Sequence, residues 1–227
     1  FSLIEIMVVI DISSIFAAAL YSFYDYHQKI YAVQQEIVSM QQNLRAAMYY
    51  MEDEIRMAGY DPTRKAGAEI ETAEAEKIYF SFVADDDGND NDDDDVTDED
   101  GELEKIEYYF NEVDGIKKLL RKEEAEAVSQ PVAEYVDALN FVYLDDDGNV
   151  LDDDGEGSVT GNNIFKIRSV QVTLVVRGER EDLNYKDNVP YTNQQGDEIL
   201  APQNDHYHRR VLTSEIRCRN IGLPKQI

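Results

Sequence analysis

The first 24 residues of the chain are almost uniformly apolar, with Glu5, Asp11 and a few hydroxyl side chains as the exceptions. At about 1.5 Å per residue, a helix of this length would span roughly 36 Å, which is enough to cross the hydrocarbon core of a bilayer. A secretory signal peptide would begin with basic residues and end in a small-residue cleavage site, and this segment has neither. Because the sequence opens on Phe1, we expect a mature chain whose leader was removed immediately before that residue.

From residue 25 onward the composition becomes polar, but apolar residues still recur at helical spacing. They lie three or four positions apart and form one stripe: Ile30, Val33, Ile37, Met40, Leu44, Met48, Met51, Ile55 and Ala58. Such spacing is typical of a helix that buries one side. No Gly or Pro occurs before Gly59, and Pro62 follows it closely, as expected of a helix C-cap and a stop. The pattern predicts one helix from about Phe1 to Ala58, roughly 87 Å long, whose second half lies against a head.

Beyond residue 61 the apolar pattern changes to the alternation and β-branched runs of strands. The candidate strands are Lys77–Val83, Leu103–Phe110, Ile116–Leu120, Leu139–Leu144, Ile167–Arg177 and Val211–Arg217. Turn-rich loops join them, including a long connection over Gly178–Asp205. One long helix followed by consecutive strands predicts an α+β fold, with the helix packed on an antiparallel β-sheet. We expect two parts, a filament-core or transmembrane helix over residues 1–58 and a globular β-rich head over residues 59–227.

The opening Phe-Ser-Leu-Ile-Glu-Ile-Met-Val-Val-Ile resembles the N-terminal motif of type IV pilins and type II secretion pseudopilins. In those proteins an aromatic residue follows the leader-peptidase cleavage site and a glutamate stands fifth in an apolar helix, as Phe1 and Glu5 do here. Three further segments, over residues 40–61, 137–144 and 209–223, resemble the PilW-type branch of this superfamily. The resemblance covers both ends and the middle of the chain and is weakest in its acidic loops.

The resemblance implies a structural subunit and not an enzyme. It implies an inner-membrane precursor, cleavage and N-methylation at Phe1, and extraction into an extracellular helical filament on a bacterial surface, with the apolar helices in its core. The partners would be copies of the chain, other pilins and the inner-membrane assembly machinery. Two roles remain open: the repeating subunit of a homopolymer, which we favour, and a low-copy minor pilin or pseudopilin that primes assembly or sits at the filament tip.

Glu5 has a physical reason to act in assembly. A carboxylate inside an apolar run costs at least ~2.5 kcal/mol unless it is paired. The cation that every chain carries at a suitable depth is its own α-amine, so pairing Glu5 with the Phe1 amine of a neighbour would compensate both charges and fix the axial register. The alternative is that Glu5 merely sits near the membrane surface.

Two features depart from the pilin pattern. Many pilins have Gly near position 14 and Pro near position 22, where the helix melts on assembly, whereas this chain has Ser14 and Ser22. If a melted segment exists here, residues 11–22 are its expected place. Asp11 is a second acid within the apolar run, and it requires either a partner or a proton.

The net charge of −27 comes largely from two acidic stretches. Residues 85–104 contain 13 acidic residues and residues 145–156 contain 7 more, with no Lys or Arg in either. In the first stretch, closely spaced side-chain oxygens around Gly88 predict a structural Ca²⁺ site, because so many carboxylates repel one another without a counter-ion. The candidate ligands are Asp85, Asp87, Asn89, Asp90 and Asp92. A solvated loop is the alternative there. Residues 145–148 directly follow a predicted strand, and for them we favour a tight turn over a metal site.

Other chemistry finds little support in the sequence. The acidic composition disfavours nucleic-acid binding, because phosphates would be repelled. The single cysteine, Cys218, permits no intramolecular disulfide, and no spacing typical of c-type haem or zinc sites occurs. There is no P-loop, HExxH or nucleophile elbow, so we expect neither a nucleotide cofactor nor catalytic residues. A glycosidase that uses a pair of carboxylates has no fixed sequence motif, so the absence of motifs does not exclude one. The acidic residues here, however, fall in turns and not in an evident cleft. His206 and His208 lack an evident third ligand, and we expect them in an exposed loop.

Overall fold

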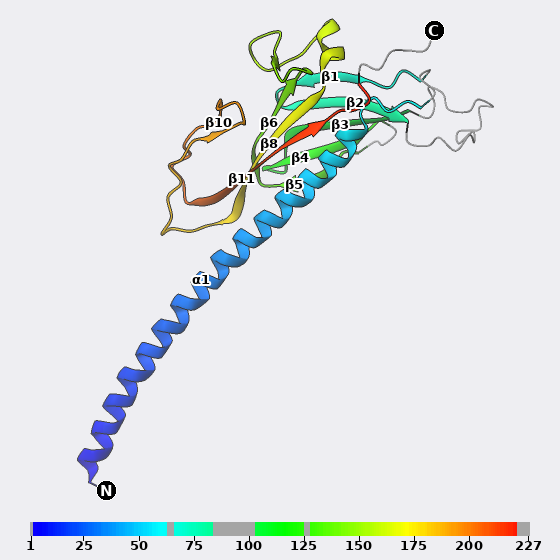
Figure 1. Ribbon diagram of the computed structural model, residues 1–227. Helices are drawn as coiled ribbons and strands as arrows, with labels where there is room; N and C mark the ends of the chain where they lie inside the picture. Colours follow the sequence, from blue (N-terminus) through cyan, green and yellow to red (C-terminus); the bar gives the residue numbers. More distant parts are fainter. Residues whose placement is uncertain (1, 63–65, 84–102, 125–127, 222–227) are drawn as a thin grey trace, which may run out of the picture. The chain divides into compact units, whose positions relative to one another are not determined.

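The computed structural model describes residues 2–62, 66–83, 103–124 and 128–221 (Figure 1). It divides into two compact units after Ser39, and each unit is described by itself. The first unit is the N-terminal part of helix α1, which runs without a break over Leu3–Met57. The second unit begins at Met40 and contains the rest of α1 together with the strands. The predicted continuous helix is therefore confirmed, and residues 11–22 are helical as well.

Gly59 ends the helix, as the sequence predicts. Its backbone has a φ of +76°, a conformation that is strained for residues with a side chain. The Gly59 N–H donates to the Ser81 carbonyl over 2.9 Å, and the Tyr60 N–H donates to the Met57 carbonyl over 2.8 Å. A Cβ atom at position 59 would lie 2.6 Å from Cδ1 of Ile221. The turn therefore requires glycine for its backbone angle and for its close approach to the chain near residue 221.

The strands of the second unit form two larger antiparallel sheets and one small ribbon. The five-stranded sheet follows chain order: β1 (Ile70–Glu74), β2 (Lys77–Val83), β3 (Leu103–Val113), β4 (Ile116–Glu123) and β5 (Gln130–Glu134). The four-stranded sheet has the order β11-β8-β6-β7, from β11 (Tyr207–Arg217), β8 (Ser169–Glu181), β6 (Val136–Leu144) and β7 (Val150–Leu151). The ribbon pairs β9 (Tyr191–Thr192) with β10 (Glu198–Leu200), and a short 3₁₀ helix, η2, covers Gly161–Lys166. The predicted α+β fold is confirmed.

The two larger sheets are joined through β5 and β6. Tyr135 is the only residue between these strands and has a φ of +56°, which turns the chain sharply from one sheet to the other. Its carbonyl accepts the N–H of Arg177 over 2.9 Å. Farther along, the Phe141 N–H donates to the Ala75 carbonyl over 2.7 Å, and the buried Tyr143 hydroxyl donates to the Glu74 carbonyl over 2.9 Å. The last two of these hydrogen bonds connect the second half of β6 to the β1–β2 hairpin of the five-stranded sheet.

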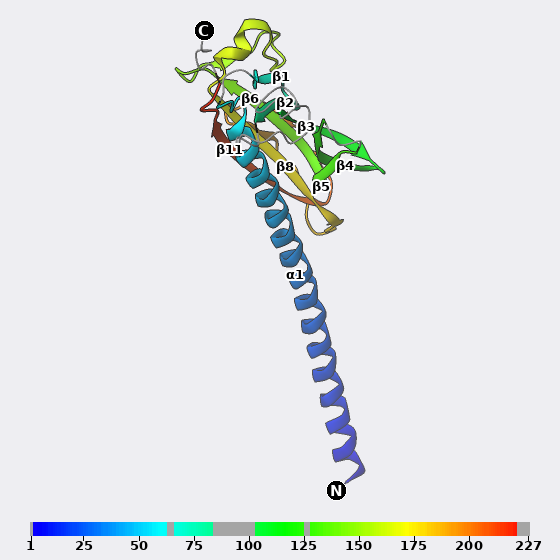
Figure 2. The same cartoon turned by 90° about the vertical axis from the view of Figure 1, so that its right-hand side faces the viewer.

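The last five turns of α1 supply part of the core of the second unit. The side chains that the sequence places on one stripe are buried here: Met40, Leu44, Met48, Met51, Ile55 and Ala58, with Ala47 beside them. Burial of a large apolar side chain stabilises the fold by roughly 1.5–3 kcal/mol. In both views α1 approaches the sheets at this end (Figure 1, Figure 2). The second unit therefore depends on residues that belong to the helix.

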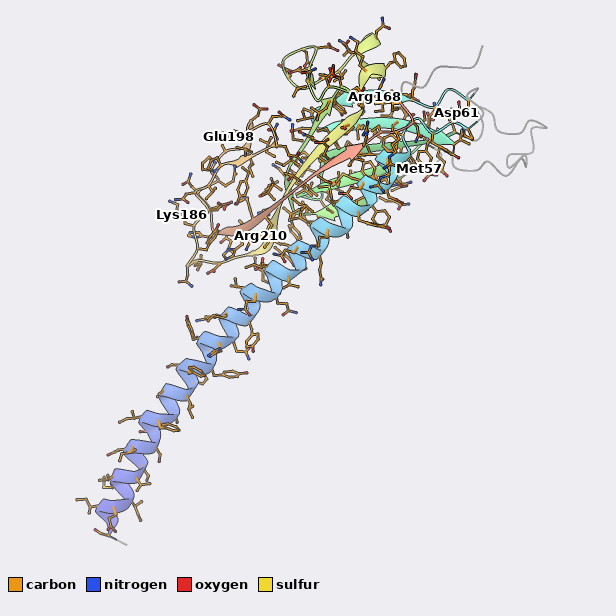
Figure 3. The ribbon with its side chains drawn as sticks, viewed as in Figure 1. Met57, Asp61, Arg168, Lys186, Glu198 and Arg210 are labelled. Atoms are coloured by element: carbon orange, nitrogen blue, oxygen red, sulfur yellow. The ribbon has the colours of Figure 1, made fainter. Side chains whose placement is uncertain are left out.

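The segment between β8 and β11 covers the outer face of the four-stranded sheet. In β8, residues 170–176 are buried without alternation, so both faces of this strand are covered. The Gln195 amide donates to Gln171 over 2.8 Å, and the Asn193 amide donates to Asn140 over 3.1 Å. The sequence predicts only a long connection over Gly178–Asp205. The structure corrects this, because β8 continues to Glu181 and the connection contains the β9–β10 ribbon. Lys186 and Glu198 mark two parts of this segment in Figure 3.

Candidate assembly surface on the N-terminal helix

The first turn of α1 is closed by Ser2 and Glu5. The Ser2 N–H donates to Glu5 Oε2 over 2.8 Å, and the Ile4 N–H donates to the Ser2 hydroxyl oxygen over 3.4 Å. A serine that caps a helix and a glutamate three positions later that reaches back to its N–H form a capping box. Glu5 thus has a local partner in the single chain, and the Ser-x-x-Glu spacing is a signal from which this could have been predicted. Phe1, the expected partner of Glu5 between subunits, lies outside the described residues.

The apolar side chains at the N-terminal end of α1 are all exposed in the single chain. Every described side chain from Ser2 to Lys29 is exposed, and Leu3 and Ile15 retain 78% and 71% of their accessible surface. Side chains stand out from this part of α1 in all directions (Figure 3). By length and composition alone, the helix contains an 18-residue window of mean hydropathy 2.2 that could cross a membrane. Contiguous apolar surface of this extent marks a site of contact with lipid or protein.

The hydroxyl groups within the apolar segment are satisfied by the helix itself. The Ser14 hydroxyl donates to the Asp11 carbonyl over 2.8 Å, and the Ser22 hydroxyl donates to the Ala18 carbonyl over 3.0 Å. Each bond satisfies the donor of a serine hydroxyl, and the helix stays unbroken. The Asp11 carboxylate is exposed and has no ion pair or hydrogen bond within the described part of the chain. Asp11 is therefore the acid of this segment that still requires a partner.

In the second unit, two glutamates of α1 have partners in the sheets. The Arg121 Nε atom lies 2.9 Å and 3.1 Å from the two carboxylate oxygens of Glu54. The Tyr108 hydroxyl donates to the same carboxylate over 2.5 Å, and burial, followed by the charge of Glu54, raises the pKa of Tyr108. Glu52 accepts a hydrogen bond from the Ser214 hydroxyl. These groups are therefore committed to holding the helix against both sheets.

The predicted calcium ligands lie outside the described residues. Asp85, Asp87, Asn89, Asp90 and Asp92 all fall within residues 84–102, so their site stays a prediction. Across the ranges that the structure does describe, no three His, Cys, Asp or Glu side chains are grouped so as to hold a metal ion.

The second acidic stretch begins with a tight turn between β6 and β7. Asp145 accepts N–H bonds from Asp147 and Asn149 through its carboxylate, over 2.9 Å and 2.8 Å, and the Gly148 N–H donates to its carbonyl over 3.2 Å. The Asn149 side chain, followed by its backbone N–H, lowers the pKa of Asp145. In the same way, the backbone N–H of Glu156 and then that of Ser158 lower the pKa of Asp154 to about 2. The turn predicted for residues 145–148 is confirmed, and its leading carboxylate is occupied by backbone donors.

The prediction that His206 and His208 lie in an exposed loop is wrong in part: His206 lies in the loop before β11, but neither side chain is fully exposed. His208 belongs to β11, stacks on Tyr185 with ring centroids 3.9 Å apart, and places Nε2 3.2 Å from the Asp182 carboxylate. Nδ1 of His206 lies 2.5 Å from the Tyr185 carbonyl oxygen. Both side chains are half-buried, because the segment after β8 folds back over the start of β11. They help to attach that segment to the sheet.

A buried arginine that the sequence does not single out fixes the same segment. Arg209 is 4% exposed and contacts three carboxylates, those of Asp137, Asp187 and Asp205, over 2.6 Å, 2.8 Å and 2.7 Å. Burial alone would lower the pKa of Arg209, but its hydrogen bonds to Asp205 and Asp187 raise it above the usual value. Asp187 and Asp205 come from the segment after β8, whereas Arg209 lies in β11 and Asp137 in β6. These ion pairs therefore hold the segment against the four-stranded sheet.

Comparison with known proteins places the chain in a family. Residues 107–220, about half of the chain, match the family model described as type IV pilus-assembly protein W, or PilW. Among solved structures, the chain is similar to a type IV-like pilin from Thermus thermophilus, with 13% sequence identity and a TM-score of 0.49. That similarity covers 80% of this chain and 97% of the pilin. A comparison with curated proteins finds no match. With the family model matched over β3 to β11 behind a long apolar helix, the chain belongs to the PilW family of type IV pilus-assembly proteins.

Proposed function

We propose that the chain is a structural subunit of an extracellular type IV pilus-like filament, assembled by helical packing of the N-terminal helices. One observation carries this proposal. The same unbroken helix buries its Met40–Met57 part in the second unit and exposes apolar side chains all round its N-terminal part. Such a surface requires lipid around it before assembly and protein around it afterwards.

Glu5 is the residue proposed to fix the register of this packing. Its capping bond to the Ser2 N–H uses one carboxylate oxygen, Oε2, in the single chain. In the filament, the carboxylate would also face the α-amine of a neighbouring Phe1, and this pair would compensate both charges in an apolar surrounding. Capping and pairing predict different effects of mutation, because only pairing needs the negative charge.

A comparison of two substitutions separates these roles. Glu5→Gln retains an oxygen that can accept the Ser2 N–H, since glutamine also serves in capping boxes, but it removes the charge. Pairing predicts that Glu5→Gln and Glu5→Ala both reduce sheared surface filaments at least tenfold while membrane insertion stays normal. Ser2→Ala is the matched control, because it removes a capping hydroxyl and leaves the carboxylate intact. A normal filament yield from Glu5→Gln, with a loss only in Glu5→Ala and Ser2→Ala, would contradict the pairing. It would show that Glu5 acts only as a helix cap.

A second role is favoured by the family match. The matched family is described as a pilus-assembly protein, which favours a low-copy minor pilin or pseudopilin that primes assembly or sits at the tip. Mass spectrometry of sheared filaments, with copies of this chain counted against all other subunits, decides between the two roles. A homopolymer predicts that this chain dominates the filament mass. A minor subunit predicts a few copies per filament and a marked fall in filament number when the chain is deleted.

The remaining parts of the proposal follow from assembly. The precursor would reside in the inner membrane through the apolar helix and would contact other pilins and the assembly machinery there. The function would be structural and not catalytic. In agreement with this, the buried charges of the second unit are paired in ways that hold its segments together, as at Glu54 and Arg209.

A further inference from the structure

We propose that the Asp11 carboxylate of one chain binds the His27 imidazole of a second copy of this chain in the filament. The inference rests on the proposed function, because it requires parallel N-terminal helices packed side by side. It starts from Asp11, which is exposed, lies within an apolar run and has no partner for its carboxylate in the described part of the chain. Packing this surface against another helix would bury the charge, and an unpaired buried charge is costly.

Asp11 is the one charged residue on its face of the helix. Residues three, four and seven positions apart share a face of a helix, and those that share a face with Asp11 are Ile4, Met7, Val8, Ser14, Ile15 and Ala18. The Ser14 hydroxyl already donates to the Asp11 carbonyl and is therefore satisfied. The large side chains among them are more than half exposed in the single chain. This face therefore carries one charged group, the Asp11 carboxylate, and the partner surface requires one complementary group.

The face around His27 is mostly apolar and carries no acid. Its neighbours at the same spacings are Leu20, Phe23, Tyr24, Ile30, Tyr31 and Gln34. The leucine and the three aromatic side chains among them are more than half exposed. The His27 ring packs edge-on against Phe23, with centroids 4.2 Å apart, and this contact positions the imidazole on the same face. No hydrogen bond or ion pair engages the imidazole among the residues described. His27 is thus a polar group on an aromatic surface, with its hydrogen-bonding capacity unused.

One axial shift brings the two faces into register. A displacement of 16 residues, or about 24 Å along a straight helix, sets Asp11 opposite His27. The same shift sets Ile4 opposite Leu20, Met7 opposite Phe23, Val8 opposite Tyr24, Ser14 opposite Ile30, Ile15 opposite Tyr31 and Ala18 opposite Gln34. A neutral imidazole can donate an N–H to the carboxylate, and an imidazolium adds charge attraction. One pair of ionisable groups in a mostly apolar seam specifies register, because a different shift buries both groups unpaired.

Lys29 is the competing cation and fits less well. Before Ser39 it is the only Lys or Arg in the sequence. Its Nζ atom already lies 2.8 Å from Asp25 on the same helix. Asp25 and Lys29 share a face, so a seam that brought Lys29 to Asp11 would bring a second carboxylate there too. His27 has no acid at three or four positions on either side, and the geometry therefore points to His27.

A double-mutant cycle on filament yield tests the pairing. Asp11→Leu leaves His27 unpaired and His27→Leu leaves Asp11 unpaired, so each should reduce sheared filaments at least tenfold. The double variant leaves neither group unpaired and should recover most of the yield. If the two sites are independent, their free-energy costs add and the two fold-losses in yield multiply in the double variant. That result would overturn the inference. Lys29→Leu serves as the control and should retain a yield within about threefold of the wild type.

Disulfide crosslinking provides a readout of the register itself. Filaments carrying Asp11→Cys together with His27→Cys should give a ladder of covalent oligomers on oxidation, because a disulfide requires Cα atoms within about 7 Å. Asp11→Cys with Tyr31→Cys, one helical turn away, should give no ladder. Filaments that crosslink equally in both pairs, or only in the control pair, overturn the proposed register. Absence of filaments containing the wild-type chain would instead overturn the proposed function.

Discussion

Replacing Arg209 with alanine should lower the free energy of unfolding of the second unit far more than a substitution of an exposed residue does. Arg209 forms ion pairs with three carboxylates, and the partners that each carboxylate would retain without Arg209 differ. Asp137 keeps Arg177, whose Nε lies 3.5 Å away, and Asp205 is 31% exposed and can be hydrated. Asp187 has no exposed side-chain surface and would keep two uncharged donors, the Tyr191 hydroxyl at 3.1 Å and the Val189 N–H at 3.4 Å. The cost is therefore dominated by one carboxylate left buried without its cation.

Removing one partner of a buried ion pair costs about 3–5 kcal/mol. Because two of the three carboxylates retain partners or water, we expect the lower end, about 3 kcal/mol. With an m-value of about 2 kcal/mol per molar urea, the unfolding midpoint would fall by roughly 1.5 M. The thermal midpoint would fall by about 6–12 °C for a domain of this size.

Urea and thermal unfolding of a soluble fragment spanning residues 29–227 measure this cost. Arg210→Ala is the matched control, because Arg210 is the next residue in β11, is exposed and is labelled in Figure 3. It should cost less than about 0.5 kcal/mol. Equal stabilities of the Arg209→Ala and Arg210→Ala fragments would refute the assigned role of the buried cluster.

The cost should also depend on pH. The hydrogen bonds of Arg209 lower the pKa of Asp205 in the folded protein. A lowered folded pKa stabilises the protein at pH values above the unfolded pKa, about 3.9, and this contribution is lost as the pH falls through the folded pKa. The stability gap between wild type and Arg209→Ala should therefore be largest near neutral pH and shrink below about pH 4. A gap that is constant from pH 7 to pH 3 would contradict the electrostatic account.

Three further predictions concern the same fragment. Met51→Ala should lower the free energy of unfolding by about 2–5 kcal/mol, because Met51 is fully buried, whereas exposed Tyr50→Ala should change it by less than about 0.5 kcal/mol in the same urea titration. Gly59→Ala should cost more than Gly115→Ala; both residues have positive φ, but only a Cβ at Gly59 meets another side chain, and equal costs would show that Ile221 simply moves aside. Calcium at a hundredfold excess over its dissociation constant should stabilise the fragment by about 2.7 kcal/mol if the stretch from Asp85 to Asp92 binds it. An unchanged melting point with calcium and with chelator, and no heat of binding near millimolar calcium, would leave that stretch as a solvated loop.

The helix could be predicted closely because local signals all agree along its length. Continuous apolar character, a stripe at spacing 3 and 4, and the pair Gly59 and Pro62 each indicate the same element, and α1 ends at Met57 as expected. The six predicted strands are present for the same reason, with their ends moved by a few residues. The turn at Asp114-Gly115, with positive φ at both residues, explains how β3 and β4 extend to meet there.

The unpredicted parts depend on contacts between distant segments. Strands β1 and β5 are short and polar, and β5 contains a proline, so their sequences carry no strand signal until a neighbour supplies hydrogen bonds. Arg209 and Asp137 are 72 positions apart, and no local spacing connects them. For the assembly surface, the sequence singles out Glu5 and Asp11, but the local role of Glu5 depends on the Ser2 N–H, which the apolar pattern does not reveal.

The order of synthesis has a consequence for the buried face of α1. This part of the helix leaves the ribosome before any strand of the second unit. Two of its partners come from the end of the chain: Ser214 donates to Glu52, and Cys218 lies against the Ile55 carbonyl. These partners are 162 and 163 positions later, so at about 5–20 residues per second the stripe waits roughly 10–30 s for them. During this interval the apolar segment that precedes the stripe has already been made, and it is long and apolar enough to cross a membrane. The proposed function therefore implies that the nascent chain is anchored in lipid before its head can close, with Met40 to Ile55 uncovered until translation has passed Cys218.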